Sequence, residues 1–460
     1  MEKIDRYIRK PKSSPAASQG RFEIYNLSEN PFPSTPFVNP ESNDARINGA
    51  IYEPSIRESE RKLLLQNFLQ VPQNDPQHLR LGYIIDASYI GRGNGKSAFL
   101  INLQREINQD FGLSISNDLN KCFSLTIHPE IHTKVKSFES FVDLFVNIIF
   151  SSEIVDDALS SLRLDAIMQI YPNFDPNTYF SGAEDLRAKL NSINWYYENK
   201  LDYIEINKHI LNNKLLQELP SDFPLYLSRM FVEVSDGNDF KEYYYSLKRG
   251  ALRYSFVFTD LVSLFLAAGF NGAYIFVDDF ERIPNFQTAR QRIDFAVELR
   301  TCLFDGMYTN AKIGFYNFIL VLHAGVPALV QEAWEQSGLE HRSPIALKGA
   351  KNVIIFEKIR VNDAFSLLKK YLQQYRIHPT DSNTDLVPFE RDAIEKIAEQ
   401  NEFNASKILK KAHEDLDRAA NSQIRSLDVQ FVQSNDGVAG EPKKILGIHD
   451  ALTKNLNEED

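Results

Sequence analysis

The sequence has only two cysteines, Cys122 and Cys302, in 460 residues. Two cysteines without metal-ligand spacing exclude a disulfide framework and a cysteine-rich metal site, and they indicate a reducing compartment. We expect both to be buried, as small apolar side chains.

Long apolar runs are also missing. No run approaches the roughly 18 to 20 residues that a membrane helix needs. The first residues, MEKIDRYIRKPKSS, lack the apolar segment of a signal peptide. We therefore expect a cytoplasmic protein that does not associate with a membrane.

The chain lacks an excess of positive charge, since its formal net charge is −11. This argues against a broadly basic surface, so nucleic-acid binding is allowed in a local groove but unsupported. One basic cluster, for which we favour a solvated tail, stands in the first residues at Arg6, Arg9, Lys10 and Lys12. With 43% apolar and 25% charged residues, the composition is that of a globular protein of two or three domains.

The most informative stretch is residues 81–100, LGYIIDASYIGRGNGKSAFL, where an apolar run breaks into three glycines and Lys-Ser before an amphipathic pattern. This predicts a strand, a phosphate-binding loop and a helix. Glycines allow positive φ, so that successive N–H groups can point at a polyphosphate. The residues expected to bind the nucleotide here are Gly91, Gly93, Asn94, Gly95, Lys96 and Ser97.

Within this loop, Lys96 can reach the β- and γ-phosphates, Ser97 can bind Mg²⁺, and the helix start adds its positive dipole end. The pattern G-x-x-x-x-G-K-[ST] places its first glycine at Ile90, whereas this sequence has it one residue later, at Gly91. The alternative is a surface glycine turn beside an ordinary lysine, but strand, loop and helix together favour the phosphate loop.

A second informative stretch is residues 273–279, AYIFVDD, an apolar strand that ends in two carboxylates. Ligands of α/β proteins bind at the carboxyl ends of parallel strands. Asp278 is predicted to hold Mg²⁺ through water, and Asp279 or Glu281 to orient and deprotonate an attacking water. The alternative is a strand that merely ends in a solvated acidic turn.

Three further apolar strands are predicted at residues 121–128, 315–323 and 352–356, and strongly apolar or amphipathic helices at 138–150 and 288–303. His323, at the end of one strand, either senses the γ-phosphate or is simply a strand-end histidine. The alternation of strands and helices predicts a parallel sheet with helices on both faces, a three-layer α/β/α fold.

The domain organisation follows from these patterns. An extended arm rich in Pro, Ser and Asn, which we expect to pack across the core, occupies residues 1–45. The core comprises residues 46–155 and 251–357, interrupted by a helical insertion at 156–250. A helical lid at 358–432 and a linker with a tail that either docks or frays, at 433–460, complete the chain.

Aromatic and basic residues interleave within residues 243–254, where Lys248, Arg249 and Arg253 stand among tyrosines. Such a segment can stack on and neutralise single-stranded nucleic acid. The alternative that we favour is that these aromatics pack inside the helical insertion.

Taken together, the motifs resemble those of the AAA+ P-loop ATPases, in particular the branch of origin-recognition initiators and transposition regulators, with STAND ATPases nearby. The resemblance covers residues 46–155 and 255–430. It implies ATP and Mg²⁺ as cofactors, and ATP rather than GTP. It also implies a homo-oligomer in which Arg342 acts as an arginine finger on a neighbour's γ-phosphate; a surface-loop arginine is the alternative.

The sequence departs from this family at three places. Asp279 stands where a glutamate usually follows the Mg²⁺-associated aspartate, and Ser406 stands where the lid carries an arginine. Lys407 could replace that arginine, although lysine lacks the planar fork of a guanidinium. The third departure is the long insertion.

Two functions follow from the resemblance. The first is a slowly hydrolysing ATPase that oligomerises and regulates a partner in DNA mobility or phage defence. The second is a nucleotide-gated scaffold with little turnover that recruits an effector protein. The missing glutamate and lid arginine favour the second.

Overall fold

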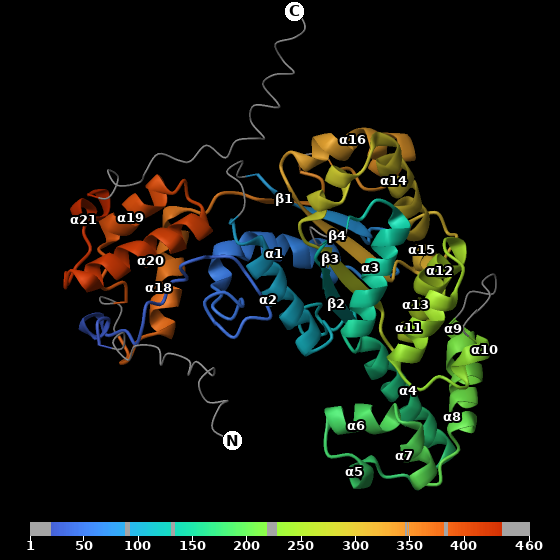
Figure 1. Cartoon of the computed structure of the whole chain (residues 1–460). Helices are drawn as coiled ribbons and strands as arrows, with labels where there is room; N and C mark the ends of the chain where they lie inside the picture. The colour runs from blue at the N-terminus through green and yellow to red at the C-terminus, as the bar shows by residue number, and fades with distance from the viewer. Residues whose placement is uncertain are drawn as a thin grey trace, which may run out of the picture. The chain divides into compact units, whose positions relative to one another are not determined.

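The structure, a computed structural model, describes residues 20–87, 93–129, 134–218, 228–345, 347, 349–380 and 385–434. The basic cluster of the first residues, Gly91 and the tail after residue 434 lie outside the described residues. The chain forms two compact units (Figure 1). Unit 1 comprises residues 1–56 and 358–460, and unit 2 comprises residues 57–357.

Unit 2 is built on a five-stranded, all-parallel sheet with the order β2-β3-β4-β1-β5. Its strands coincide with the five predicted apolar runs, so the predicted parallel sheet is confirmed. The runs are nearly continuous in apolar residues because both faces of the sheet are buried. The strands are β1 (Leu81–Asp86), β2 (Cys122–Ile127), β3 (Gly272–Val277), β4 (Tyr316–His323) and β5 (Val353–Phe356).

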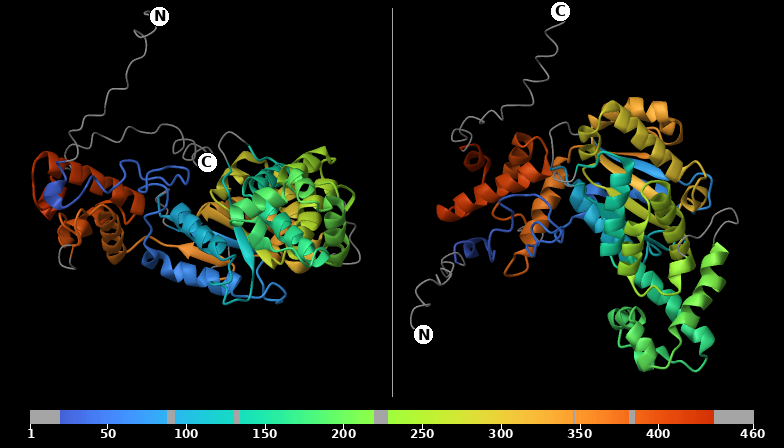
Figure 2. Two further views of the ribbon diagram at one scale, coloured as in Figure 1. Left: turned by 90° about the horizontal axis from the view of Figure 1, so that it is seen from below. Right: turned by 45° about the vertical axis from the view of Figure 1, so that its right-hand side comes forward.

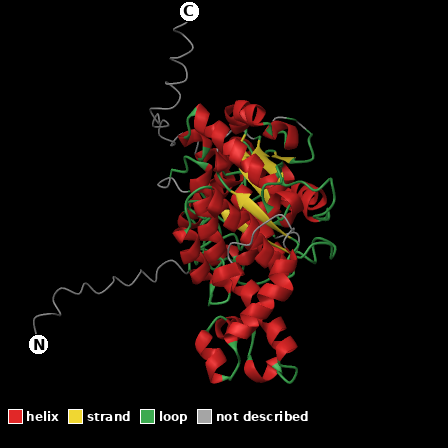
Figure 3. Ribbon diagram, turned by 90° about the vertical axis from the view of Figure 1, so that its right-hand side faces the viewer, coloured by secondary structure: helices red, strands yellow, loops and turns green. Residues whose placement is uncertain are grey.

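Helices cover both faces of the sheet (Figure 3). On one face, Thr126 of β2 donates a hydrogen bond to Gln104 of α2, and Phe356 of β5 packs edge-on against Phe99 of α2 at 5.1 Å between ring centroids. The helices of this face are α1 (Glu58–Leu64), which continues as a π-helical turn (Leu65–Leu69), and α2 (Lys96–Gln109).

The opposite face of the sheet is covered by apolar helices that pack through aromatic rings. Phe145 of α3 lies edge-on to Tyr316 and Phe318 of β4, with ring centroids 5.1 and 5.4 Å apart. These contacts make the fold an α/β fold with a sheet between two helical layers. The helices of this face include α3 (Phe138–Ser151), α13 (Leu261–Ala267), α14 (Ala289–Leu303) and α16 (Val326–Ser337).

The predicted insertion, residues 156–250, is helical where it is described. Its buried side chains, such as Tyr196 and Phe240, belong to the same hydrophobic cluster as Phe318 of the sheet. The insertion therefore extends the core of unit 2 rather than building a core of its own, and Figure 2 shows its helices in green continuing from the sheet-covering layer. They are α4 (Ile154–Ile170), α5 (Pro176–Tyr179), α6 (Ala183–Leu190), α7 (Ile193–Glu198), α8 (Tyr203–Ile210), α9 (Leu216–Glu218), α10 (Ser228–Phe231) and α11 (Gly237–Ser246).

The aromatic and basic segment at residues 243–254 packs against α3. Arg253 has a side chain only 7% exposed, and its Nη1 lies 2.9 Å from Oδ1 of Asp143. The hydroxyl of the buried Tyr244 donates to the same oxygen at 2.6 Å. These contacts favour packing over nucleic-acid binding, because the ring and the guanidinium are already engaged inside the protein.

Unit 1 joins the N-terminal arm to the C-terminal helices. From its sequence, the arm is expected to pack across the core. Instead Phe22, Tyr25 and Phe32 are buried in one hydrophobic cluster with residues of the C-terminal helices. Phe32 lies edge-on to Phe389 at 5.9 Å between centroids, so the arm is a structural part of this unit. The helices are α18 (Val361–Gln374), α19 (Arg391–Gln400), α20 (Ala405–Asn421) and α21 (Val429–Gln433).

Two predictions from composition can be compared with the fold. Cys122 and Cys302 are both buried and free, as expected, and burial raises the pKa of the Cys122 thiol to about 12. Among the described residues, no helix has the length and apolar character that crossing a bilayer requires.

Candidate functional site

Polar side chains gather where the parallel strands of unit 2 end. Asp86 is the last residue of β1 and pairs in register with His323, the last residue of β4. Asp278 follows β3, and His128 follows β2. Because all five strands run in the same direction, these residues share the carboxyl edge of the sheet, where α/β proteins bind ligands.

The glycine loop leads from this edge into α2. Gly93 and Gly95 have φ values of 112° and 83°, a region in which residues with a side chain are strained. Gly95 stands immediately before the first helical residue, Lys96, and has no side chain to cap the helix. Backbone N–H groups at a helix start without such a cap are suited to an anion. The first half of the loop, residues 88–92 with Gly91, lies outside the described residues.

Lys96 forms a buried ion pair with Asp86. Its Nζ lies 2.6 Å from Oδ2 of Asp86, and the two side chains are 8% and 1% exposed. Asn94 donates to the other oxygen, Oδ1, at 3.2 Å. A phosphate that approaches the loop therefore competes with Asp86 for the Lys96 ammonium.

The side chain of Asn94 is engaged within the protein. Besides Asp86, it donates to the carbonyl of Glu357 at 2.9 Å and accepts from Nη2 of Arg57 at 2.8 Å. Arg57 is held in turn by Glu60, 2.7 Å from its Nη1. This network holds the Asn94 side chain and its carbonyl, so the predicted nucleotide contact of Asn94, which stays a prediction, would fall to its backbone N–H.

Ser97 and Asp278, the two predicted Mg²⁺ ligands, lie directly against each other. The Ser97 hydroxyl donates to Oδ2 of Asp278 at 2.7 Å, and Nδ1 of His128 lies 3.8 Å from the same oxygen. Burial raises the pKa of Asp278, and the neighbouring Asp279 adds to this, while the Ser97 hydrogen bond opposes it. A hydroxyl and a carboxylate at this spacing can bind a hard divalent cation directly or through water.

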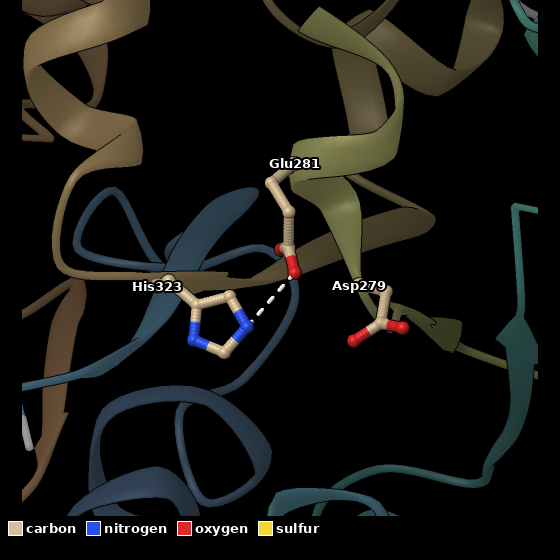
Figure 4. Close-up of side chains that lie close together, drawn as sticks. All are labelled: Asp279, Glu281 and His323. Carbon is tan, nitrogen blue, oxygen red and sulfur yellow. Dashed lines mark ion pairs between the residues drawn. The ribbon is translucent and has the colours of Figure 1, made fainter. Parts of the chain in front are cut away.

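Asp279, Glu281 and His323 form the third part of the edge (Figure 4). One ligand atom from each lies within 4.8 Å of the other two. His323 Nε2 is 3.0 Å from Oε1 of Glu281, and Asp279 pairs with Arg282 at 2.6 Å. Asp279 has a φ of 50°, in the left-handed region, which turns the chain sharply after β3. The structure thus brings together both candidate bases and the candidate γ-phosphate sensor.

Arg342 does not belong to this edge. It ends α17 (Leu339–Arg342), and the next residue, Ser343, donates to the carbonyl of Leu81, the first residue of β1, at 2.8 Å. Lys96 pairs with Asp86, the last residue of β1, so exposed Arg342 lies at the opposite edge of the sheet. Any action of Arg342 on a phosphate must therefore occur on another copy of the chain, which stays a prediction.

Lys407 lies in unit 1, near the start of α20. Its Nζ is 2.6 Å from Oε2 of Glu402, and Asn404 caps the helix by accepting from the Lys407 N–H at 3.1 Å. The hydroxyl of Ser406, the residue in place of the family's arginine, donates to the carbonyl of Pro36 at 2.7 Å. The predicted nucleotide contact of Lys407 stays a prediction.

Sequence reasoning missed Asp86, Arg57 and Glu60. For Asp86 a signal was present, because an acidic residue that ends a buried apolar strand is the same signal that identified Asp278. For Arg57 there was none, since its partners Asn94 and Glu357 stand 37 and 300 residues away in the sequence. Glu60 pairs with Arg57 at a spacing of three residues, but nothing local links that pair to the loop. Sequence comparison assigns no family, because no family model and no curated protein matches the chain.

The raised pKa of Asp278 makes a prediction about stability. The folded state holds the Asp278 proton to a higher pH than the unfolded state does, so this group's contribution to the free energy of unfolding falls as pH rises above the ordinary value of 3.8. In the Asp278→Asn variant the side chain at this position cannot ionise. We therefore expect the variant's stability, relative to the unchanged protein, to increase with pH from about 4 and then level off.

This can be measured by urea denaturation in EDTA, followed by tryptophan fluorescence. Both tryptophans, Trp195 and Trp334, lie in unit 2, so the signal reports on this unit. Asp294→Asn, whose side chain is 54% exposed, is the matched control. Equal pH profiles for the two variants would contradict the assignment.

Proposed function

We propose that the chain is an AAA+-like P-loop ATPase, a molecular switch that binds ATP with Mg²⁺ at the carboxyl edge of unit 2 and hydrolyses it slowly. The observation that carries this proposal is the 2.7 Å contact between Ser97, at the start of α2, and Asp278, at the end of β3. Two segments 181 residues apart thereby supply the hydroxyl and the carboxylate that a Mg²⁺–nucleotide complex requires.

In this proposal each residue has a defined role. Lys96 neutralises the β- and γ-phosphates, and the backbone of Gly93 to Ser97 donates to them. Ser97 and Asp278 would hold Mg²⁺, which supplies charge neutralisation when bound. Glu281 or Asp279 orients and deprotonates the water, and His323 contacts the γ-phosphate from the end of β4.

The wider setting rests on the sequence resemblance. It supports the choice of ATP over GTP, a helical lid at residues 358–432, a protein partner and a role in DNA mobility or phage defence. The charge of −11 and the engagement of Tyr244 and Arg253 inside the protein give nucleic-acid binding no support; Lys248 and Arg249 are exposed.

A nucleotide-gated scaffold with little or no turnover is the second candidate. It is favoured by the contacts of the two candidate bases: Asp279 is paired with Arg282, and Glu281 lies against His323. The Asp279 carboxylate must leave Arg282 before it can accept a proton from water, and the Glu281 side chain, only 9% exposed, has little access to water.

Nucleotide binding is tested by removing the Lys96 ammonium without stranding its partner. Lys96→Ala alone leaves the buried Asp86 carboxylate without its cationic partner, which typically costs about 3–5 kcal/mol of stability and would confuse the result. The double variant Asp86→Asn/Lys96→Ala removes both charges. We expect it to bind a non-hydrolysable ATP analogue about 10- to 100-fold more weakly than the unchanged protein, because a charge-assisted hydrogen bond contributes about 1.5–3 kcal/mol.

Asp86→Asn alone, the matched control, keeps the ammonium and removes the carboxylate that competes for it. Because it too leaves one buried charge without its counter-charge, its folding is established first. The folded variant should retain binding in the same calorimetric titration. Circular dichroism and thermal melting establish that all variants are folded. Unchanged affinity in the folded double variant would refute the site.

Turnover separates the two candidate functions. Slow hydrolysis predicts Mg²⁺-dependent phosphate release that falls about 10²-fold or more in Glu281→Gln or Asp279→Asn, because a general base contributes at least this much. Nucleotide affinity should change little in either of these two variants. Binding of ATP without phosphate release by the unchanged protein would instead establish the scaffold.

Self-association tests the role of Arg342. We expect the molar mass from light scattering to rise with Mg²⁺ and the ATP analogue, and Arg342→Ala to prevent most of the phosphate release that accompanies assembly. Arg290→Ala, an arginine on α14 with an 82% exposed side chain, is the control. A monomer under every condition would exclude a shared site in homo-oligomers.

A further inference from the structure

A cluster of three side chains is distinct from the proposed Mg²⁺ ligands Ser97 and Asp278. It consists of Asp279, Glu281 and His323. They come from the turn after β3 and from the last residue of β4, and their ligand atoms lie within 4.8 Å of one another. In Figure 4, the Glu281 carboxylate and the His323 ring point toward each other, and the Asp279 carboxylate stands beside them.

Glu281 is the residue that points to a ligand. Its side chain is only 9% exposed, yet neither of its oxygens accepts a hydrogen bond. His323 Nε2 lies 3.0 Å from Oε1, but this contact lacks hydrogen-bond geometry. Burying a carboxylate is costly unless it is paired, hydrogen-bonded or bound to a metal. Two oxygens without hydrogen bonds beside an imidazole nitrogen therefore favour a further partner.

We propose that Asp279, Glu281 and His323 bind a divalent transition-metal cation, with Zn²⁺ as the best-suited ion. One imidazole nitrogen and two carboxylates suit Zn²⁺, whereas Mg²⁺ takes oxygen ligands. Three protein ligands leave a position open for water or for a ligand oxygen, as at catalytic zinc sites.

The surroundings of the cluster fit this assignment. Arg282 forms an ion pair with Asp279, with Nη2 2.6 Å from Oδ2, and contacts of this kind commonly fix the orientation of a ligating carboxylate. Asp279 directly follows Asp278 in the sequence, so this site would lie next to the proposed Mg²⁺ position. The proposal does not rest on nucleotide binding, because it uses only the contacts of these three side chains. A bound ion would occupy Asp279, Glu281 and His323, so the base and sensor roles proposed above belong to the metal-free site.

The test is a calorimetric titration. The full chain is first stripped of metal with a chelator, and Zn²⁺ alone is then titrated into it in the absence of nucleotide. We expect one equivalent to bind, to raise the melting temperature, and to remain bound in excess Mg²⁺. His323→Ala and Glu281→Gln should each weaken binding about 100-fold and remove the rise in melting temperature, since each loses one of three ligands.

His209→Ala, a histidine on α8 that contacts Gln169 and Asn213, is the matched control and should bind like the unchanged protein. Glu281→Gln keeps the side-chain shape, so it reports on the ligand even if the histidine variant folds poorly. Binding that is absent, that Mg²⁺ displaces, or that both cluster variants retain would overturn the proposal. None of these results depends on whether the chain binds ATP.

Discussion

The buried ion pair between Lys96 and Asp86 is the contact on which the candidate site depends. It ties the first residue of α2 to the last residue of β1 across the glycine loop, at 2.6 Å. Asn94 bonds to the same carboxylate, and Arg57 and the Glu357 carbonyl hold Asn94 in turn. A charge buried this deeply is stable only while its partner is present. The end of β1, Asn94 and the start of α2 therefore depend on one another energetically.

The sheet explains why the other polar groups meet at the same place. Parallel strands deliver their carboxyl ends to one edge, and apolar side chains along each strand are buried on both faces. Aromatic packing of α3 against β4 and the joining of the insertion to this core hold the edge in position. The acidic and imidazole groups can thus lie close together without themselves stabilising the fold.

Features that depend on residues close together in the sequence could be predicted. Buried strands leave apolar runs with turn residues at both ends, and glycines before Lys96 mark a loop with positive φ. Features that depend on distant partners could not be predicted. The burial of Arg253 depends on its ion pair with Asp143. The N-terminal arm packs where Phe32 contacts the ring of Phe389, and the carbonyl of Glu357 holds the Asn94 side chain. No local pattern specifies these pairs.

The account is tested most directly by an experimental structure of the protein with Mg²⁺ and a non-hydrolysable ATP analogue. We predict that Lys96 Nζ lies about 2.7–2.9 Å from a phosphate oxygen, having left Asp86 or sharing it, with Mg²⁺ beside Ser97 and Asp278. A nucleotide bound elsewhere, with Lys96 still paired only with Asp86, would contradict the proposed site.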